Sequence, residues 1–234
     1  MTPELTIRLF SNDQYCLDKV FYSNFYRLKP REDKEQNVVV DIGAHCGYFA
    51  FAAMSMGAKR IYCFEPFIDN FRILSKNTEQ SEAGVIIPHQ LGVYPISSNL
   101  KFFYPTYGEG KFFDFSNIEI DKTEGKYHTS PCISLDEILQ EYVQEDVVDI
   151  LKINMGYAEG EVLMSSHTLN RKVNAICGEI FSDKEGIQEF KSIMEKKGYT
   201  DSYFSTVSEE EGKFVFLLAK DKCDKYFNTV FSSE

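Results

Sequence analysis

The segment from Val38 to Gly47 predicts a buried strand that ends in a tight glycine turn. Uninterrupted β-branched residues before Asp41 are typical of a parallel strand that is covered on both faces. Gly43 and Gly47 allow the backbone to turn sharply and to approach a ligand closely. A helix is expected from Tyr48, and the N–H groups at its start favour a negative group of that ligand. The pattern therefore predicts an α/β fold with a ligand-binding turn.

A second strand, expected at residues 60–64, ends in Glu65-Pro66. At this position the second strand of such a unit can offer a carboxylate to a ribose diol. The spacing Gly-x-x-x-Gly differs from the Gly-x-Gly-x-x-Gly of dinucleotide enzymes, whose turn holds a pyrophosphate. A cofactor with a ribose but no phosphate fits better, and S-adenosylmethionine is the common one. The alternative is a plain α/β turn with a chance glycine pair and a surface Glu65.

Composition limits the classes that the chain can belong to. The 234 residues carry a net charge of −11. They can bury a full core, so we expect one main domain at residues 37–234 after an N-terminal arm at residues 1–36. An acidic surface with scattered basic residues repels phosphate backbones, which argues against nucleic acid as a partner. No apolar run reaches the roughly 18 residues of a membrane span and no signal-peptide pattern is seen, so no membrane partner and a cytoplasmic location are expected.

The cysteines and histidines are spread along the chain. None of the six cysteines forms a Cys-x-x-Cys pair, which argues against a disulfide framework and a zinc site. The four histidines are not paired with carboxylates at ligand spacing, so no metal is expected. Cys46 lies inside the glycine turn, where a packing side chain is expected rather than a reactive thiol.

Strand and helix patterns alternate after the first strand. Further strands are expected at residues 85–90, 147–153 and 173–180, and helices at residues 48–56, 68–77, 158–169, 185–197 and after a cap at Ser134. Such alternation predicts a parallel sheet, and a hairpin at residues 199–204 and 214–219 adds an antiparallel edge. The aromatic-rich segment 99–129 interrupts the alternation. It is either a β-excursion or lid beside the carboxyl ends of the strands or a surface hairpin without a role.

Several motifs together resemble the FkbM family of S-adenosylmethionine-dependent methyltransferases. The matching pieces are VVVDIGAHCGYF, MGAKRIYCFEP, ISLDEIL, VDILKINMGYAEGEVL and GEI. The resemblance implies a Rossmann-like class I methyltransferase fold: a seven-stranded, mostly parallel sheet with an antiparallel C-terminal strand and helices on both faces. The usual activity of the family is O-methylation of hydroxyls on sugars or secondary metabolites.

The resemblance also implies which residues bind the cofactor. The loop residues are Asp41, Gly43, His45, Gly47 and Tyr48. Glu65 corresponds to the acid that binds the ribose. The residues expected around the adenine or near the reacting group are Pro66, Phe67, Leu91, Gly92 and Asn154.

The chain departs from the family after the fourth strand. Asn154 stands where an aspartate is expected, and Gly156-Tyr157 replace Glu-Gly, whereas Lys152 and Glu159 are kept. An aspartate could orient or deprotonate a hydroxyl, but an asparagine can only orient it by hydrogen bonding. The expected catalytic set is therefore Lys152, Asn154, Tyr157, Glu159 and His128.

Three functions remain open at this point. The first is O-methylation of a small molecule, with a base from His128, His167 or Glu159. The second is N-methylation, because Asn154 and Tyr157 have the spacing of the Asn-Pro-Pro-Tyr motif of amino-methyltransferases. The third is a non-catalytic relative that binds the cofactor or a partner. We expect a small-molecule methyltransferase and prefer oxygen over nitrogen; the acceptor and the oligomeric state are left open.

Overall fold

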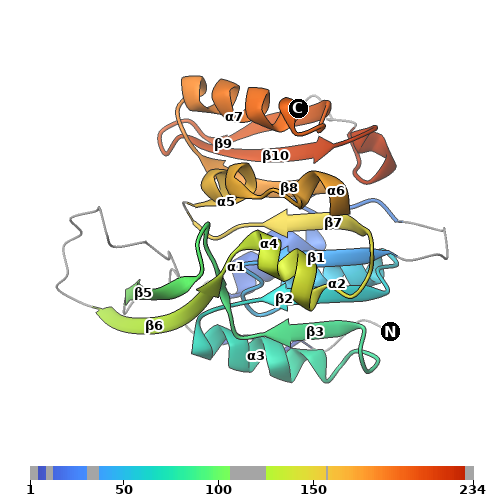
Figure 1. Ribbon diagram of the computed structural model, residues 1–234. Coiled ribbons are helices and arrows are strands. Elements are labelled where there is room, and N and C mark those ends of the chain that lie inside the picture. Colours follow the sequence, from blue (N-terminus) through green and yellow to red (C-terminus); the bar gives the residue numbers. More distant parts are fainter. Residues whose placement is uncertain (1–4, 9–12, 31–36, 106–124, 157, 230–234) are drawn as a thin grey trace.

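A seven-stranded sheet forms the centre of the molecule (Figure 1). The computed structural model describes residues 5–8, 13–30, 37–105, 125–156 and 158–229. The strands are β1 (Val38–Ile42), β2 (Arg60–Phe64), β3 (Ile86–His89), β7 (Val148–Ile153), β8 (Val173–Phe181), β9 (Asp201–Ser208) and β10 (Lys213–Ala219). Their order is β3-β2-β1-β7-β8-β10-β9, and β10 alone runs antiparallel to the other strands of this sheet. The predicted fold class is thereby confirmed.

A small second sheet stands beyond the carboxyl ends of the parallel strands (Figure 1). It consists of β4 (Gly92–Val93), β5 (Ser98–Pro105) and β6 (Gly125–Ile133), in the order β4-β6-β5. Residues 99–105 and 125–129 of the aromatic-rich segment thus belong to two antiparallel strands. The remainder of that segment lies outside the described residues.

Helices cover both faces of the central sheet, because its strands alternate large apolar side chains between two cores. Val40 and Ile42 face one core with α4 (Leu135–Glu137), the π-helix η2 (Ile138–Tyr142), α5 (Glu159–Ser165), α6 (Leu169–Lys172) and α7 (Lys184–Lys196). Val39 faces the other core with α2 (Tyr48–Ser55) and α3 (Ile68–Thr78). None of the helices in the described ranges is both long enough and apolar enough to span a bilayer.

The N-terminal arm packs against α2, which explains why that helix is apolar on every side. The arm contains α1 (Asp13–Leu17) and the π-helix η1 (Asp18–Tyr22). Tyr48 of α2 shares a buried cluster with Leu17 of α1, and Phe49 contacts the ring of Tyr26 edge-on. Since α2 starts at the glycine turn, this packing brings the arm next to the predicted ligand site.

The predicted hairpin at the edge of the sheet is confirmed, because β9 pairs antiparallel with β10 and forms the edge strand. One local prediction is wrong. The helix expected at residues 158–169 is divided into α5 and α6. Asp136 accepts hydrogen bonds from Ser166 Oγ at 2.5 Å and from the N–H of Thr168 at 3.0 Å, which holds this part of the chain out of a helix.

Candidate active site

A cavity of about 650 Å³ lies at the carboxyl ends of β1, β2, β7 and β8. One side of its wall comes from the arm, through residues such as Tyr15, Cys16, Lys19 and Val20. Another side comes from the small sheet, through Gly92, Val93 and Phe102. Open α/β sheets bind ligands at this edge, so the position agrees with a substrate or cofactor site.

The glycine turn has little space because β7 ends directly beside it. Gly43 has a φ of 72°, and a Cβ at this position would lie 1.9 Å from the backbone oxygen of Asn154. The N–H groups of Gly43 and Ala44 donate to the carbonyl of Phe64 at 3.0 and 3.1 Å, which joins the turn to β2. Only glycine satisfies both the backbone angle and the close approach at residue 43.

A buried ion pair supports the turn from below. Lys152 Nζ lies 2.9 Å from Asp41 Oδ1 and donates to the carbonyl of Gly43 at 2.8 Å. Both side chains are buried, and burial raises the pKa of Asp41 although Lys152 counteracts this. Neither residue lines the cavity. The contacts therefore place both residues in support of the loop.

Glu65 is a buried carboxylate on the cavity wall. It accepts hydrogen bonds from His45 N at 2.8 Å, Phe67 N at 3.0 Å and Asn70 Nδ2 at 3.3 Å. Burial raises its pKa to about 6 in spite of these donors. A carboxylate has about four lone-pair positions, so capacity remains for a ribose hydroxyl. Glu65 thus fits the sugar of the expected cofactor.

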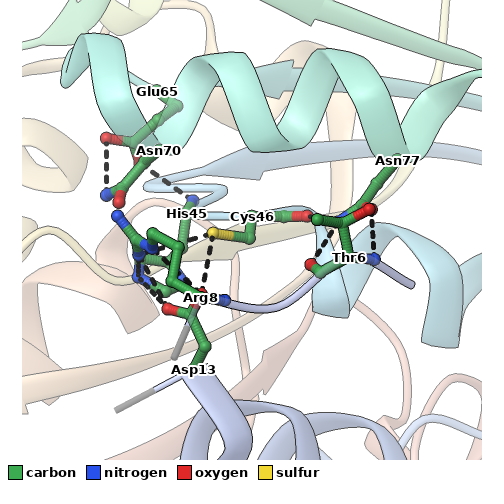
Figure 2. A network of polar contacts seen from close by, with 8 residues as sticks. All are labelled: Thr6, Arg8, Asp13, His45, Cys46, Glu65, Asn70 and Asn77. Atoms are coloured by element: carbon green, nitrogen blue, oxygen red, sulfur yellow. Dashed lines mark hydrogen bonds and ion pairs between the residues drawn. The ribbon is translucent and has the colours of Figure 1, made fainter. Parts of the chain in front are cut away.

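A second polar cluster joins the arm to the turn (Figure 2). The guanidinium of Arg8 donates to Asp13 at 2.7 Å, contacts His45 Nε2 at 3.2 Å and lies 3.5 Å from Cys46 Sγ. The ligand-type atoms of Asp13, His45 and Cys46 lie within 4.8 Å of one another, as they would around a metal ion. Arg8 is the cation that these three groups contact in the structure.

Glu179, at the end of β8, is the centre of a third cluster. It accepts from Asn154 Nδ2 at 2.7 Å and from the Tyr26 hydroxyl at 3.2 Å, and it pairs with Lys19 at 3.1 Å and with Lys213 at 2.5 Å. Burial alone would raise its pKa, but the two ammonium groups hold the pKa below the ordinary value. Glu179 is therefore a stable anion that faces four donors.

This cluster fixes the orientation of the Asn154 amide. A carboxylate only accepts hydrogen bonds, so the side of Asn154 that faces Glu179 must be its NH₂ group. The second amide hydrogen can reach the Tyr26 hydroxyl at 3.0 Å. The carbonyl oxygen Oδ1 receives no donor from the described residues, and Asn154 lines the cavity. The site thus leaves an acceptor oxygen for an incoming O–H or N–H group.

The structure brings together a large part of the predicted site. Seven of the expected cofactor residues line the cavity: Gly43, His45, Glu65, Pro66, Leu91, Gly92 and Asn154. Four others lie behind this layer: Asp41, Gly47, Tyr48 and Phe67.

Of the other predicted catalytic residues, those that the structure describes do not line the cavity. Glu159 accepts from the N–H groups of Met155 and Gly156 at 2.6 Å each, and so shapes the loop after β7. His128 packs edge-on against the ring of Phe67, with centroids 5.9 Å apart. His167 lies between α5 and α6, and Tyr157 lies outside the described residues.

Sequence reasoning missed the arm and the end of β8 as parts of the site. The missed cavity residues include Lys19, Tyr26, Glu179 and Lys213. The sequence did contain an indication of Glu179: it is an acid within the apolar strand 173–181, and a buried acid needs a polar or charged partner. The arm residues had no such signal, since aromatic and basic residues in a polar segment are also typical of a surface.

A comparison of sequences decides the family. The model of the methyltransferase FkbM domain matches residues 41–200, which is most of the chain. The chain belongs to the FkbM methyltransferase family. S-adenosylmethionine is the cofactor of this family, so the predicted cofactor is confirmed at the family level. No curated protein matches this chain in sequence.

Solved structures support the fold. An FkbM methyltransferase from Methylobacillus flagellatus is 12% identical with a TM-score of 0.52, and the match covers 80% of this chain and 44% of that one. The METTL16 MTase domain is 11% identical with a TM-score of 0.49. That match covers 88% of this chain and 65% of that domain, so the chain spans less than two thirds of it.

The prediction of a small-molecule partner to the exclusion of nucleic acid is wrong. Matched structures include a chain described as a putative RNA methyltransferase, PH1948 from Pyrococcus horikoshii. PH1948 is 13% identical to this chain with a TM-score of 0.47, and the match covers 93% of this chain and 94% of that one. The net charge of −11 describes the whole chain, whereas Lys19 and Lys213 lie together at the cavity. The total charge therefore does not decide which acceptor approaches this site.

Proposed function

We propose that the cavity binds S-adenosylmethionine and that the chain transfers its methyl group to an O–H or N–H acceptor. The bond between the methyl carbon and sulfur breaks, S-adenosylhomocysteine leaves, and the proton of the acceptor is released to solvent. The bound cofactor supplies an already activated methyl group. The glycine turn would hold the amino-acid end, Glu65 the ribose, and Leu91 with Gly92 the adenine. The observation that carries the proposal is the buried Glu65 carboxylate, which faces the cavity beside the turn with acceptor capacity to spare.

Asn154 would position the acceptor. Its Oδ1 accepts a hydrogen bond from the O–H or N–H of the acceptor, so that a lone pair of the reacting atom points at the methyl group. Alignment and exclusion of water contribute much of the rate of such displacements, with effective molarities on the order of 10⁵ M or more. A carboxylate base at residue 154 is not required for this role. We prefer a hydroxyl, and an amine is the second candidate because the same oxygen accepts from N–H.

Replacing Glu65 with alanine is expected to weaken the binding of S-adenosylhomocysteine by about 1.5–3 kcal/mol, the scale of a hydrogen bond to a charged group. Isothermal titration measures this affinity. Glu145→Ala is the control, since Glu145 binds the Tyr62 hydroxyl at 2.9 Å away from the cavity. If Glu65→Ala and Glu145→Ala bound S-adenosylhomocysteine with equal affinity, Glu65 would not be the residue that binds the ribose.

The affinity of the wild-type chain is expected to depend on pH. Ribose hydroxyls donate to the ionised form of Glu65, whose pKa is about 6. Binding is therefore strongest above pH 6 and weakens as the pH falls through this value, because the carboxyl must lose its proton to bind. Titrations between pH 5 and pH 8 test this; the dependence is expected to disappear in Glu65→Ala.

Replacing Asn154 with aspartate is expected to destabilise the chain, although it restores the residue that the family usually has. The new carboxylate would lie about as close to Glu179 as the amide does now, and one of the two would hold a proton. The pKa of the pair is then higher in the folded chain than in the unfolded chain. The loss of stability is therefore small near pH 4 and grows as the pH rises to 7, as thermal unfolding would show.

The double variant Asn154→Asp/Glu179→Gln is the matched control. Its glutamine amide donates to the new aspartate, which reverses the direction of the hydrogen bond and removes the repulsion. We expect its stability to be close to that of the wild type. A double variant as unstable as the single one would show that repulsion is not the cause.

Turnover decides between an enzyme and a non-catalytic relative. The assay uses S-adenosylmethionine with a tritiated methyl group and a panel that contains RNA, hydroxylated sugars and amines. Mass spectrometry of the product then distinguishes oxygen from nitrogen. Binding of the cofactor without transfer to any member of the panel would favour the non-catalytic role.

A further inference from the structure

Arg8 reaches from the N-terminal arm into the cofactor turn (Figure 2). Its Nε and its backbone N–H both bind Asp13 Oδ2, at 3.0 and 2.8 Å, and its terminal nitrogen binds Asp13 Oδ1 at 2.7 Å. Asp13 is fully buried, so the guanidinium is held in one place. The same terminal nitrogen contacts His45 Nε2 at 3.2 Å. A planar guanidinium can make these contacts together, whereas a lysine ammonium is a point charge on a flexible stem.

The contact with Arg8 determines which nitrogen of His45 carries the proton. Arginine only donates hydrogen bonds, so His45 Nε2 must accept, and the proton of the neutral ring is on Nδ1. The pKa of His45 is lowered to about 4: burial is the largest cause, Arg8 and Lys152 act in the same direction, and Asp13 partly opposes them. The ring is therefore neutral at physiological pH.

His45 links Arg8 to the carboxylate that faces the cavity. His45 has a φ of 52°, a left-handed conformation that a non-glycine residue rarely adopts without support. In this conformation its backbone N–H donates to Glu65 Oε2 at 2.8 Å. Asn77 makes a second connection between the arm and the turn. Thr6 N donates to Asn77 Oδ1 at 2.7 Å, and Asn77 Nδ2 donates to the carbonyl of Cys46 at 2.9 Å.

We infer that Arg8 is a positioning residue for the cofactor: it fastens the arm to the turn and, through His45, holds the Glu65 carboxylate in place for the ribose. This inference rests on the proposed function, because it assumes that the cavity binds S-adenosylmethionine. Arg8 lies before residues 41–200, the range that the family model matches, so the inference assigns a role in cofactor binding to a residue outside that range. The arm is thus part of the cofactor site.

The test compares the affinities of Arg8→Ala, Arg8→Lys and the wild type for S-adenosylhomocysteine at pH 8, where Glu65 is ionised. We expect Arg8→Ala to bind about tenfold more weakly, which corresponds to about 1.4 kcal/mol. Arg8→Lys should lie in between, because it keeps the charge but not the planar contacts. Arg72→Ala, on the exposed surface of α3, is the control and should bind like the wild type.

The nitrogen chemical shifts of the His45 ring provide a readout that a purely structural role of Arg8 would not change. In the wild type they should show a neutral ring with its proton on Nδ1. In Arg8→Ala the pKa of His45 should rise, since Asp13 then lies beside the ring without a competing guanidinium. The other titratable groups around the ring are Cys46, Tyr48, Glu65 and Lys152.

The outcomes separate the two proposals. Affinity of Arg8→Ala equal to the wild type, or a His45 ring unchanged in tautomer and pKa, would overturn the positioning role alone. If Arg8→Ala loses its folded state together with binding, Arg8→Lys is the variant that tests the positioning role. An affinity of Arg8→Lys equal to that of the wild type would also overturn this role. A wild-type chain that does not bind S-adenosylhomocysteine would overturn the proposed function and this role with it.

Discussion

Lys152→Met is expected to destabilise the chain by about 3–5 kcal/mol, the range found when one partner of a buried ion pair is removed. The substitution leaves Asp41 buried without its ammonium partner and removes the donor that binds the carbonyl of Gly43. The pKa of Asp41 would rise further in the folded state. The loss is therefore smallest at low pH, where Asp41 is protonated in both states, and grows as the pH rises.

Urea unfolding at pH 5 and pH 8 measures this effect. Lys225→Met is the matched control, because Lys225 pairs with Asp221 at 3.1 Å while both side chains are about half exposed. Exposed pairs contribute little, so this control should lose less than about 0.5 kcal/mol. The double variant Asp41→Leu/Lys152→Met should recover much of the stability, since it leaves no buried charge. Similar losses in Lys152→Met and Lys225→Met would contradict the supporting role of Lys152.

Gly43→Ala is expected to abolish cofactor binding and to destabilise the chain by about 2–5 kcal/mol, from the left-handed backbone and overpacking together. The new methyl group would lie 1.9 Å from the backbone oxygen of Asn154. That atom belongs to the residue directly after β7, whose N–H binds the carbonyl of Ile42 at 3.1 Å, so it cannot move without shifting the end of the strand. Relief of the clash must therefore displace the turn from the cavity.

Gly198→Ala is the control for the backbone angle. Gly198 follows α7 with a φ of 94°, and a Cβ there would meet nothing within 4 Å. Its cost should therefore be only the roughly 1–2 kcal/mol of the left-handed conformation. Calorimetry with S-adenosylhomocysteine and urea unfolding compare the two variants. Unchanged binding in Gly43→Ala would show that the turn does not touch the cofactor.

Local patterns were enough to predict the central fold. The period of apolar residues and the helix signals lie within short windows, so β2 (Arg60–Phe64) and the capping box at Ser134 agree with the prediction. The division of the helix after residue 158 could not be predicted in this way. It depends on Asp136, which lies about thirty residues away from the chain that it binds.

The candidate site shows the same limit. The turn and Glu65 belong to one continuous segment, and their pattern predicted their proximity. Lys19 and Glu179, by contrast, are 160 residues apart and meet only because the arm folds over the ends of β7 and β8. No local pattern reports such a contact. A buried acid only indicates that a partner exists and does not say which one.

The antiparallel strand β10 has a consequence for the chemistry of the cavity. An antiparallel strand begins where its parallel neighbour ends, so Lys213, its first residue, stands at the same edge as Glu179. The length of the short turn before β10 therefore determines whether Lys213 lies beside Glu179, because a register slip of one residue would place the lysine on the opposite face of the sheet. A deletion in this turn would thus change the pKa of the buried Glu179 without altering any parallel strand.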